Sequence, residues 1–419
     1  MQDFIITGGN RLSGEITLQG SKNSTLPIMA AAFLVNGKCT LLHCPKLTDV
    51  YSASRILNCL GSVCRLKNDR AEIDSTAVSD SVIPENLMRE MRSSIMFMGA
   101  ILGRMGECTV SIPGGCELGP RPIDMHLAAL SKMGVEITDR HGKICCKIPD
   151  GRAKGARISL FFPSVGATEN IILCAVLADG ETVINNAARE PEICDLCGFL
   201  RSCGAKIKGD GESRIIIEGV RELHSCEYTV MPDRIAGATY LSMTAASGGE
   251  IILKNACIAE TEPFISVLEQ TGCRIYSADN RIYLRRSGRL KSVRDRIRTM
   301  PHPGFPTDAQ AILMAALVTA DGTSVFEENI FDCRYRHTDA LIKMGADIQV
   351  MGKAAVIRGV PRLHGAEIEA TDLRGGAAMA VAALAAEGVT RLSCISHIDR
   401  GYENFEKVIS AVGGKIRRE

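Results

Sequence analysis

Apolar and polar residues follow a pattern along the chain that recurs about every 70 residues, six times in all. Each unit holds an apolar run such as STLPIMAAAFLV or AGATYLSMTAAS, then a glycine-marked turn and a short alternating run. A second helix-like segment in each unit ends at a glycine: Gly61, Gly134, Gly204, Gly272, Gly345 and Gly413. Glycine is typical of the left-handed position that ends a helix. The pattern predicts strand, helix, strand, helix, strand, strand in every unit.

The first helix of each unit is rich in Ala, Leu, Ile and Met on nearly all sides, which is typical of a buried helix. At 419 residues, the chain exceeds the size at which one hydrophobic core usually stops growing. We therefore expect an α/β protein of two domains with three units each, apolar helices inside and sheets outside. The division should fall near residue 230.

Composition narrows the function classes. The apolar fraction of 46% and the formal net charge of +1 are typical of a globular protein. With no Trp, 4% aromatic residues and no basic excess, the chain offers little surface for nucleic acid. The start has no basic segment followed by a long apolar core, and the longest apolar run, 377–386, is about half a membrane span. We expect a cytoplasmic protein that binds no nucleic acid or membrane and has no obligate protein partner.

Cysteines are numerous, 17 in all, but a long chain of this kind is expected to keep them reduced and mostly buried. Cys194 and Cys197 form a CxxC pair, yet no second pair at metal-ligand spacing follows. We therefore expect no metal. Cys116 differs from the others, because Gly and Pro flank it in the predicted loop SIPGGCELGPRPID, residues 111–124.

Cations stand near the starts of four predicted first helices: Lys22, Arg92, Arg234 and Arg374. A helix N-terminus disfavours a cation by about 0.3–1 kcal/mol, so an anion is expected to share each site. The last two follow an aspartate closely, and either that aspartate or a ligand can be the anion: Asp233 and Asp372. No acidic residue adjoins Lys22, for which a bound phosphate or carboxylate is the preferred interpretation. Helix capping is expected from Ser164, Thr307 and Thr371.

Eight blocks, which begin at residue 20 and extend almost to the end of the chain, carry a resemblance to a known family: GSKNSTLPI, PGGCELGPRPID, PSVGATEN, NAAREPEI, VMPDRIAGATY, HPGFPTD, TDLRGG and HIDRGYENFE. In this order they resemble the UDP-N-acetylglucosamine enolpyruvyl transferases of the EPSP synthase superfamily. The resemblance implies a two-domain inside-out α/β barrel of six βαβαββ repeats. It also implies an N-terminal domain of residues 21–230 and a C-terminal domain of residues 1–20 with 231–419.

The family transfers the enolpyruvyl group of phosphoenolpyruvate to the 3′-hydroxyl of UDP-N-acetylglucosamine and releases phosphate, as the first committed step of peptidoglycan precursor synthesis. Such a reaction needs an acid, a base and cations, and the resemblance implies no metal and no cofactor. Cys116 matches the proton donor to C3 of phosphoenolpyruvate, on a loop expected to act as a lid. Asp308 matches the residue at the sugar hydroxyl, where a carboxylate can take up the proton.

Four residues match the phosphoenolpyruvate site: Lys22, Asn23, Arg121 and Arg400. A guanidinium group suits phosphate and carboxylate because its N–H groups meet two oxygens at once. For the nucleotide sugar, the resemblance implies a larger set: Arg92, Arg121, Pro122, Ile123, Asp124, Met125, Ser164, Val165, Gly166, Asp308 and Ile330. Arg374 is expected to bind substrate as well.

Other interpretations stay open. Cys116 could be a structural cysteine, Asp308 a first-turn carboxylate stabilised by the helix dipole, and the arginines solvated surface residues. Two rival functions are the sister enzyme that acts on shikimate 3-phosphate, and a silent relative that only binds a nucleotide sugar. The motifs GSKN and PGGC argue against the sister enzyme, since its members open with a GSKS-type motif and lack the loop cysteine.

Overall fold

The computed structural model describes residues 2–111, 123–140 and 142–419. The described chain forms two compact units, each with its own hydrophobic core. The first unit contains the described residues between 20 and 231, and the second contains residues 2–19 and 232–419.

The first unit holds three small sheets within its described residues. The strands are β3 (Lys38–Leu42), β4 (Val63–Lys67), β5 (Arg70–Asp74), β6 (Glu107–Ser111), β7 (Glu136–Arg140), β8 (Lys143–Lys147), β9 (Arg157–Ser159), β10 (Glu181–Asn185), β11 (Lys206–Lys208), β12 (Arg214–Glu218) and β13 (Glu227–Thr229). The strand orders are β13-β3-β5-β4, β6-β8-β7 and β11-β12-β10-β9. The edge strands β13 and β9 pair in parallel, and the other pairs are antiparallel. The three-stranded sheet has no parallel edge strand among its described residues, but an isolated parallel bridge joins Val82 to Thr109 of β6 at the corresponding position.

Helices of the first unit include a central group of three that pack against one another, α1, α4 and α6. The helices are α1 (Lys22–Ala32), α2 (Thr48–Cys59), α3 (Glu85–Glu90), the 3-10 helix η1 (Arg92–Met96), α4 (Phe97–Met105), α5 (Asp124–Lys132), α6 (Val165–Ala175) and α7 (Pro191–Ser202). α4 and α6 approach closely at Gly99, where a Cβ atom would stand 2.3 Å from the backbone oxygen of Asn170. A larger residue at this position would force the two helices apart.

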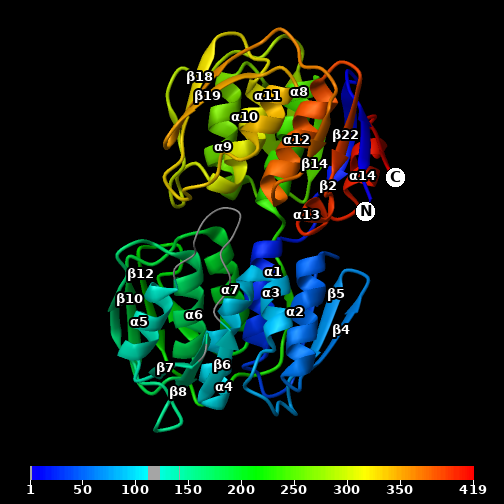
Figure 1. The fold of residues 1–419 in the computed structure, drawn as a ribbon. Helices are drawn as coiled ribbons and strands as arrows, with labels where there is room; N and C mark the ends of the chain where they lie inside the picture. The colour runs from blue at the N-terminus through cyan, green and yellow to red at the C-terminus, as the bar shows by residue number, and fades with distance from the viewer. Residues whose placement is uncertain (1, 112–122, 141) are drawn as a thin grey trace. The chain divides into compact units, whose positions relative to one another are not determined.

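The second unit holds three further sheets in its described part. The strands are β1 (Phe4–Thr7), β2 (Leu12–Thr17), β14 (Gly249–Lys254), β15 (Arg274–Ala278), β16 (Arg281–Arg286), β17 (Ile297–Arg298), β18 (Thr323–Glu327), β19 (Asp347–Met351), β20 (Ala354–Arg358), β21 (Glu367–Glu369), β22 (Val389–Ser393) and β23 (Lys415–Arg418). The strand orders are β21-β22-β1-β23, β15-β16-β14-β2 and β17-β18-β20-β19. Since β1 pairs with β23, both ends of the chain lie in one sheet (Figure 1).

Helices α8, α10 and α12 form the centre of the second unit and pack pairwise. The helices are α8 (Arg234–Ser247), α9 (Ile258–Gln270), α10 (Thr307–Leu317), α11 (Thr338–Lys343), α12 (Leu373–Ala385), α13 (Ser396–Asp399) and α14 (Phe405–Ala411). In α8 and α12 nearly every side chain is buried, as expected for helices that are apolar on all sides. In Figure 1 strands β18 and β19 lie on one side of these helices, and β2 and β22 on the other.

The six repeated glycines confirm one local prediction. All have positive φ, between 86° and 98°: Gly61, Gly134, Gly204, Gly272, Gly345 and Gly413. They follow the ends of α2, α5, α7, α9, α11 and α14, and a strand begins shortly after each. The glycines thus end one helix of each unit in the left-handed conformation that other residues rarely adopt.

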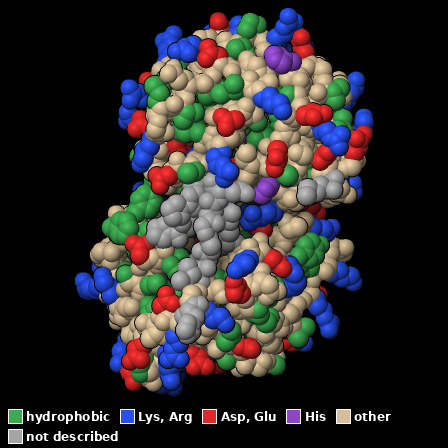
Figure 2. Space-filling view, in the orientation of Figure 1, with side chains coloured by type: hydrophobic (Ala, Val, Ile, Leu, Met, Phe, Trp, Pro, Cys, Tyr) green, Lys and Arg blue, Asp and Glu red, His purple; other side chains and the backbone are tan. Residues whose placement is uncertain are grey.

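The described cysteines form no disulfide with one another, and most of them are buried. On α7, Cys197 is buried and Cys194 is half-buried. Within the described residues, no helix combines the length and the apolar character that crossing a membrane requires. Figure 2 shows acidic and basic side chains interspersed over the face in view, as the net charge of +1 suggests.

Candidate active site

Lys22 is the first residue of α1, and Ser21 caps that helix by accepting a hydrogen bond from the Ser24 backbone N–H at 3.3 Å. The ammonium nitrogen of Lys22 lies 3.2 Å from Oδ2 of Asp49, in the first turn of α2. Both side chains are largely buried, at 12% and 3% exposure. The sequence favoured a ligand phosphate or carboxylate as the partner of Lys22. In the structure the carboxylate of Asp49 is beside Lys22. Asn23, the next residue of α1, is half-buried.

Three segments predicted to contact the nucleotide sugar begin helices in the first unit. η1 begins at Arg92, whose side chain is outside the described part of the structure. α5 follows Ile123 directly and begins with the exposed Asp124 and the half-buried Met125. These three predicted residues therefore lie together at the start of one helix. α6 begins with Val165 and Gly166, and Ser164 caps it as predicted, accepting from the Ala167 N–H at 3.3 Å.

Asn170 of α6 joins these three segments. Its Oδ1 accepts a hydrogen bond from the Gly99 backbone N–H at 2.6 Å, and its Nδ2 donates to the Ile95 carbonyl at 3.0 Å. Nδ2 also lies 2.8 Å from Nδ1 of His126 on α5. Burial lowers the pKa of His126 to about 4, and the charge of Asp124 only partly opposes this. The ring is therefore neutral at pH 7, and its Nδ1 can accept from Asn170.

Glu169, next to Asn170, is a buried carboxyl group with a stability consequence. Burial, together with the charges of Glu192 and Glu190, raises the pKa of Glu169 from its ordinary value of 4.5 to about 8. The folded chain therefore retains a proton that the unfolded chain releases between these two values. The contribution of protonated Glu169 to the free energy of unfolding is present in full below pH 4.5. It decreases as the pH rises towards 8, by up to about 1.4 kcal/mol per pH unit.

We expect Glu169→Gln to remove most of this loss, because an amide has no proton to lose. The measurement is the free energy of urea unfolding at pH 6.5 and pH 8, a window above the lowered pKa values of the buried His126 and His337, both about 4. Glu181→Gln, at an exposed position of β10, serves as the matched control. Equal pH dependence in the wild type and Glu169→Gln would contradict this assignment.

Asp308 lies in the first turn of α10, in the second unit. Nη2 of Arg334 donates to its Oδ1 at 2.7 Å, and Nη2 of Arg374 donates to its Oδ2 at 3.0 Å. Both arginine side chains are buried, at 3% and 5% exposure, whereas the Asp308 side chain is 28% exposed. Two guanidinium groups favour the charged carboxylate and fix its orientation, and the charged form is the one that can accept a proton.

Arg374 extends this arrangement into the core. Its Nη1 donates to the Tyr402 hydroxyl at 3.3 Å, and that hydroxyl is 2.7 Å from Oγ1 of Thr239 on α8. Burial lowers the pKa of Arg374, but the charge of Asp308 more than compensates and raises it overall. Arg374 therefore stays charged, and it connects the starts of α10 and α12 to α8.

The aspartates before Arg234 and Arg374 act as helix caps. Asp233 accepts from the N–H groups of Ile235 and Ala236. Asp372 accepts from the N–H groups of Arg374 and Gly375. The Arg374 guanidinium bonds a more distant acidic group, the carboxylate of Asp308, which lies 66 residues away in the sequence.

Two predicted caps were wrong. α10 has Pro306 at its N-cap, and the Thr307 hydroxyl instead donates to Glu328. α12 is capped by Asp372, while the Thr371 hydroxyl donates to that aspartate. In each case the threonine hydroxyl donates to a carboxylate: Glu328 is 21 residues away, whereas Asp372 is the next residue and is itself the cap of α12.

Ile330 and Arg400 also lie near these helix starts. The buried carboxylate of Glu328 accepts from the Ile330 N–H at 2.9 Å and from the Thr307 hydroxyl, which holds Ile330 beside the start of α10. Arg400 is half-buried and follows α13. The next residue, Gly401, packs so closely on Leu373 that a Cβ atom would stand 2.7 Å from it, which sets this segment against the start of α12.

The predicted site residues thus fall into two groups, one in each unit. Lys22, Asn23 and the starts of η1, α5 and α6 belong to the first unit, and Asp308, Ile330, Arg374 and Arg400 to the second. Three predicted residues lie outside the described residues: Cys116, Arg121 and Pro122.

Sequence reasoning missed several residues that position this site: Asp49, Asn170, Glu328, Arg334 and Tyr402. Asn170 and Tyr402 fall within the resembling blocks PSVGATEN and HIDRGYENFE, which was the one available signal for them. The other three stand in ordinary helix-start or loop sequences, and only the fold brings them to the site.

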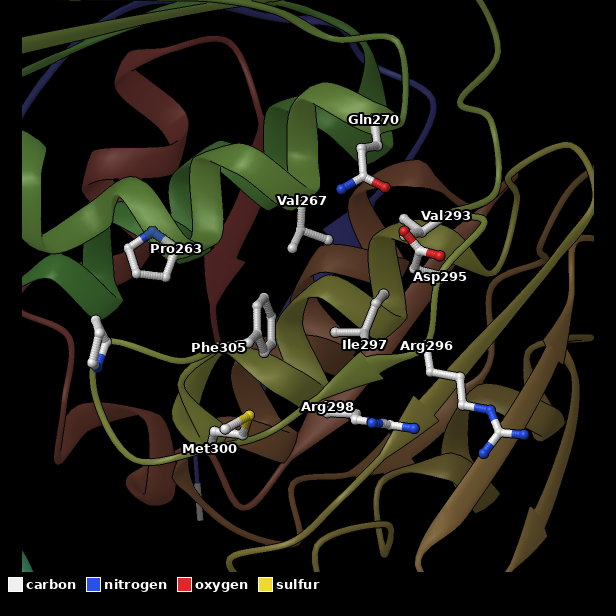
Figure 3. A pocket seen from close by; sticks show the side chains of 11 residues that line it. Pro263, Val267, Gln270, Val293, Asp295, Arg296, Ile297, Arg298, Met300 and Phe305 are labelled. Carbon is white, nitrogen blue, oxygen red and sulfur yellow. The ribbon is translucent and has the colours of Figure 1, made fainter. Parts of the chain in front are cut away.

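A surface hollow of about 390 Å³ lies elsewhere in the second unit, between α9 and the segment 293–305. Figure 3 shows apolar side chains of Val267, Ile297 and Phe305 at its floor. Of the site residues that the structure describes, none lines it. The chemistry of the site is therefore to be sought at the helix starts and not in this hollow.

Comparisons with known proteins place the chain in a family. Residues 6–409 match the family model EPSP synthase (3-phosphoshikimate 1-carboxyvinyltransferase). The chain is 49% identical over 418 residues to UDP-N-acetylglucosamine 1-carboxyvinyltransferase 2 of Caldanaerobacter subterraneus, covering 100% of both chains. It is 47% identical over 425 residues to UDP-N-acetylglucosamine 1-carboxyvinyltransferase of Zymomonas mobilis, covering 100% of this chain and 99% of that one.

Solved structures agree on the fold. The enolpyruvyl transferase NikO from Streptomyces tendae superposes with a TM-score of 0.89 at 22% identity, over 100% of this chain and 98% of that one. EPSP synthase from Acinetobacter baumannii superposes with a TM-score of 0.79 at 20% identity, over 100% of both chains. The two-unit α/β architecture is therefore that of the EPSP synthase type. The chain belongs to the EPSP synthase family of enolpyruvyl transferases and, within it, to the UDP-N-acetylglucosamine 1-carboxyvinyltransferases.

Proposed function

We propose that the chain transfers the enolpyruvyl group of phosphoenolpyruvate to the 3′-hydroxyl of UDP-N-acetylglucosamine and releases phosphate, in the cytoplasm, as the first committed step of peptidoglycan precursor synthesis. The observation that carries this proposal is the partly exposed Asp308 carboxylate, which accepts hydrogen bonds from two buried guanidinium groups. The substrates come from the names of relatives that are 47–49% identical over the whole chain.

In the proposed reaction, Cys116 donates a proton to C3 of phosphoenolpyruvate while the sugar 3′-oxygen attacks C2 and passes its proton to Asp308. The resulting adduct then loses phosphate and a proton from C3, which restores the double bond. Four residues are proposed to bind the phosphate and carboxylate of phosphoenolpyruvate: Lys22, Asn23, Arg121 and Arg400. Charge-assisted hydrogen bonds of this kind are stronger than neutral ones.

The nucleotide sugar is proposed to bind at helix starts, where backbone N–H groups can meet its diphosphate. These are the starts of η1, α5 and α6, with Arg92, the segment from Arg121 to Met125, and the segment from Ser164 to Gly166. The hydrogen bonds of Asn170 to Gly99, Ile95 and His126 support this assignment, because they hold the three starts in a fixed arrangement. Asp308, Ile330 and Arg374 are proposed to complete the site from the second unit.

We further propose that the fold is an inside-out α/β barrel pair of six βαβαββ repeats. One domain, residues 21–230, would carry the cysteine loop, and the other, residues 1–20 with 231–419, the aspartate. Support comes from the division of the described chain into two units and from three sheets in each. The buried central helices of each unit are a second line of support.

The experiment that tests the function measures phosphate release from phosphoenolpyruvate with and without UDP-N-acetylglucosamine. We expect release only with the nucleotide sugar, together with a product heavier by one enolpyruvyl group. Release with shikimate 3-phosphate instead would identify the sister reaction. Binding of the nucleotide sugar without any release would identify a silent binding protein, and either result would overturn the proposal.

Asp49 is proposed to position Lys22 for phosphoenolpyruvate. We expect Asp49→Asn to raise the KM for phosphoenolpyruvate about 10-fold with a smaller change in kcat, since a hydrogen bond to a charged group contributes about 1.5–3 kcal/mol. The measurement is steady-state kinetics at saturating nucleotide sugar. Asp74→Asn is the control, because Asp74 pairs with the exposed Lys38 at 3.7 Å and such surface pairs contribute little. An unchanged KM in Asp49→Asn would contradict this role.

A further inference from the structure

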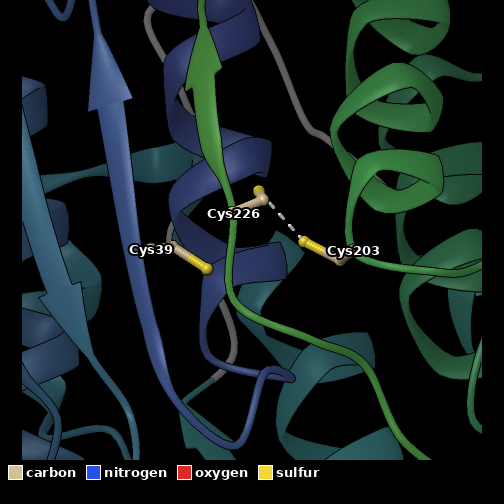
Figure 4. A group of neighbouring side chains, drawn as sticks. All are labelled: Cys39, Cys203 and Cys226. Carbon is tan, nitrogen blue, oxygen red and sulfur yellow. Dashed lines mark hydrogen bonds between the residues drawn. The ribbon is translucent and has the colours of Figure 1, made fainter.

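Three cysteines far apart in the sequence meet in the first unit. Cys39 lies on β3, Cys203 directly follows α7, and Cys226 directly precedes β13. Their sulfur atoms all lie within 4.8 Å of one another, and those of Cys203 and Cys226 are 3.3 Å apart. Figure 4 shows the three side chains pointing toward one another from three different elements. Among the described residues, these three cysteines are the group of His, Cys, Asp and Glu side chains whose ligand atoms lie close enough together to hold one metal ion.

Backbone hydrogen bonds fix the three positions. The Thr40 N–H donates to the Cys226 carbonyl at 3.0 Å, next to the parallel pairing of β13 with β3. The His224 N–H donates to the Cys203 carbonyl at 2.7 Å. The sulfur atoms are therefore held together by the fold, and a ligand would not have to assemble them.

Burial and access differ among the three thiols. Cys39 and Cys203 are buried, at 1% and 0% exposure. Cys226 is half-buried and is the most accessible residue of the three. An ion could enter past Cys226 and would then be enclosed by the other two.

Hydrogen bonding within the group favours a thiolate. Hydrogen bonds from Cys203 and then from Cys226 lower the pKa of the Cys39 thiol to about 4, against an opposing effect of burial. The same interactions raise the pKa of Cys203 far above its ordinary value. Cysteine binds a metal ion as the thiolate, so the lowered pKa of Cys39 is compatible with a role as ligand.

We propose that Cys39, Cys203 and Cys226 form a binding site for one thiophilic metal ion of the Zn²⁺ and Cd²⁺ class. On binding, the ion forms three metal–sulfur bonds, and the remaining thiol protons pass to solvent. A fourth position is left on the side of Cys226, where water can coordinate. The site is independent of the enolpyruvyl transfer reaction proposed above.

The geometry favours an ion over a disulfide. Sulfur atoms bound to Zn²⁺ at about 2.3 Å in a tetrahedral arrangement stand about 3.8 Å apart, close to the spacing of this group. A disulfide requires about 2.05 Å between the sulfur atoms and would use only two of the three cysteines. Three converging thiols also match the preference of soft ions for thiolate ligands.

The test uses the reduced full chain, free of thiol reagents and kept under inert gas. Cd²⁺ is added stepwise, and the ultraviolet absorption of the cadmium–thiolate bond is recorded. We expect saturation at one equivalent, displacement by Zn²⁺, and a higher melting temperature with the ion bound, because the ion joins β3, α7 and β13 in the folded state only. Absence of a saturable absorption would overturn the proposal.

Cys39→Ser is expected to weaken Cd²⁺ binding about 100-fold or more, since even partners outside the ligand shell typically contribute 10- to 100-fold. Cys64→Ser is the matched control, because Cys64 and Cys39 flank the same residue, Ile73, in one sheet, and Cys64 stands outside the group. Equal binding by the wild type and Cys39→Ser would overturn the proposal. So would a Cys203–Cys226 disulfide in a chain that, once reduced, binds no Cd²⁺.

A measurement on the wild type avoids any effect of substitution on folding. With excess Cd²⁺, alkylation of Cys226 by N-ethylmaleimide should slow about 10-fold or more, in proportion to occupancy. Cys145 and Cys194 are also half-buried but stand outside the group, so their labelling should not change. Unprotected Cys226 at saturating Cd²⁺ would contradict the site.

Discussion

Asp308→Asn is expected to lower turnover about 10²- to 10⁴-fold, the usual contribution of a general base, while UDP-N-acetylglucosamine binding changes much less. Asparagine keeps the shape of the side chain, but its single oxygen can accept from only one of Arg334 and Arg374, and it cannot take up the proton of the sugar hydroxyl. Phosphate release measures turnover, and calorimetric titration measures binding. A lower melting temperature is also expected, because two buried guanidinium groups lose their counter-charge.

Asp339→Asn provides the control for this experiment. Asp339 is likewise in the first turn of a helix, α11, but it is exposed. Its substitution should leave turnover near the wild-type value. A folded Asp308→Asn chain with wild-type turnover would remove Asp308 as the base.

Fosfomycin, an epoxide mimic of phosphoenolpyruvate, is expected to alkylate Cys116 and abolish activity. In this step the thiolate sulfur attacks an epoxide carbon, the carbon–oxygen bond breaks, and the oxygen takes up a proton. A cysteine that serves as nucleophile or acid needs access and a nearby cation, and the loop sequence offers Arg121 for this. Cys116→Ser should resist alkylation and should itself lower turnover about 10²- to 10⁴-fold.

Peptide mapping of the labelled chain shows whether fosfomycin reacts with Cys116 or with whichever cysteine is most exposed. Among the described cysteines, Cys59 and Cys333 are exposed and would react first if access alone decided the outcome. Cys59→Ser and Cys333→Ser should therefore leave inactivation unchanged. A label on either of these residues instead of Cys116 would contradict the assignment of the acid.

Short-range signals in the sequence were enough for several features of the fold. The helix ends at Gly61 and Gly345, for example, follow from the freedom of glycine at positive φ, which needs no distant partner. The cap at Ser164 is similar, since its acceptor and donor lie three residues apart. Burial of the central helices follows from apolar side chains on all sides.

Partners of charged and polar side chains could not be predicted in this way. Lys22 meets Asp49 at a separation of 27 residues, and Arg374 meets Asp308 at a separation of 66. Thr307 was expected to cap its helix but donates to Glu328, 21 residues away. In each case several local partners were chemically acceptable, and packing of helices onto one another selected a distant one.

The sequence by itself determined the sixfold pattern of helix ends, the apolar helices and the family blocks that contain Lys22, Cys116 and Asp308. Tertiary structure alone decided which groups hold the reactive side chains in place, and it alone brought Cys39, Cys203 and Cys226 together. The physical reason is the distance along the chain over which each kind of interaction acts. Backbone conformation and hydrophobic periodicity depend on neighbours in the chain, whereas ion pairs and metal-binding groups depend on distances that exist only after the helices and sheets have packed.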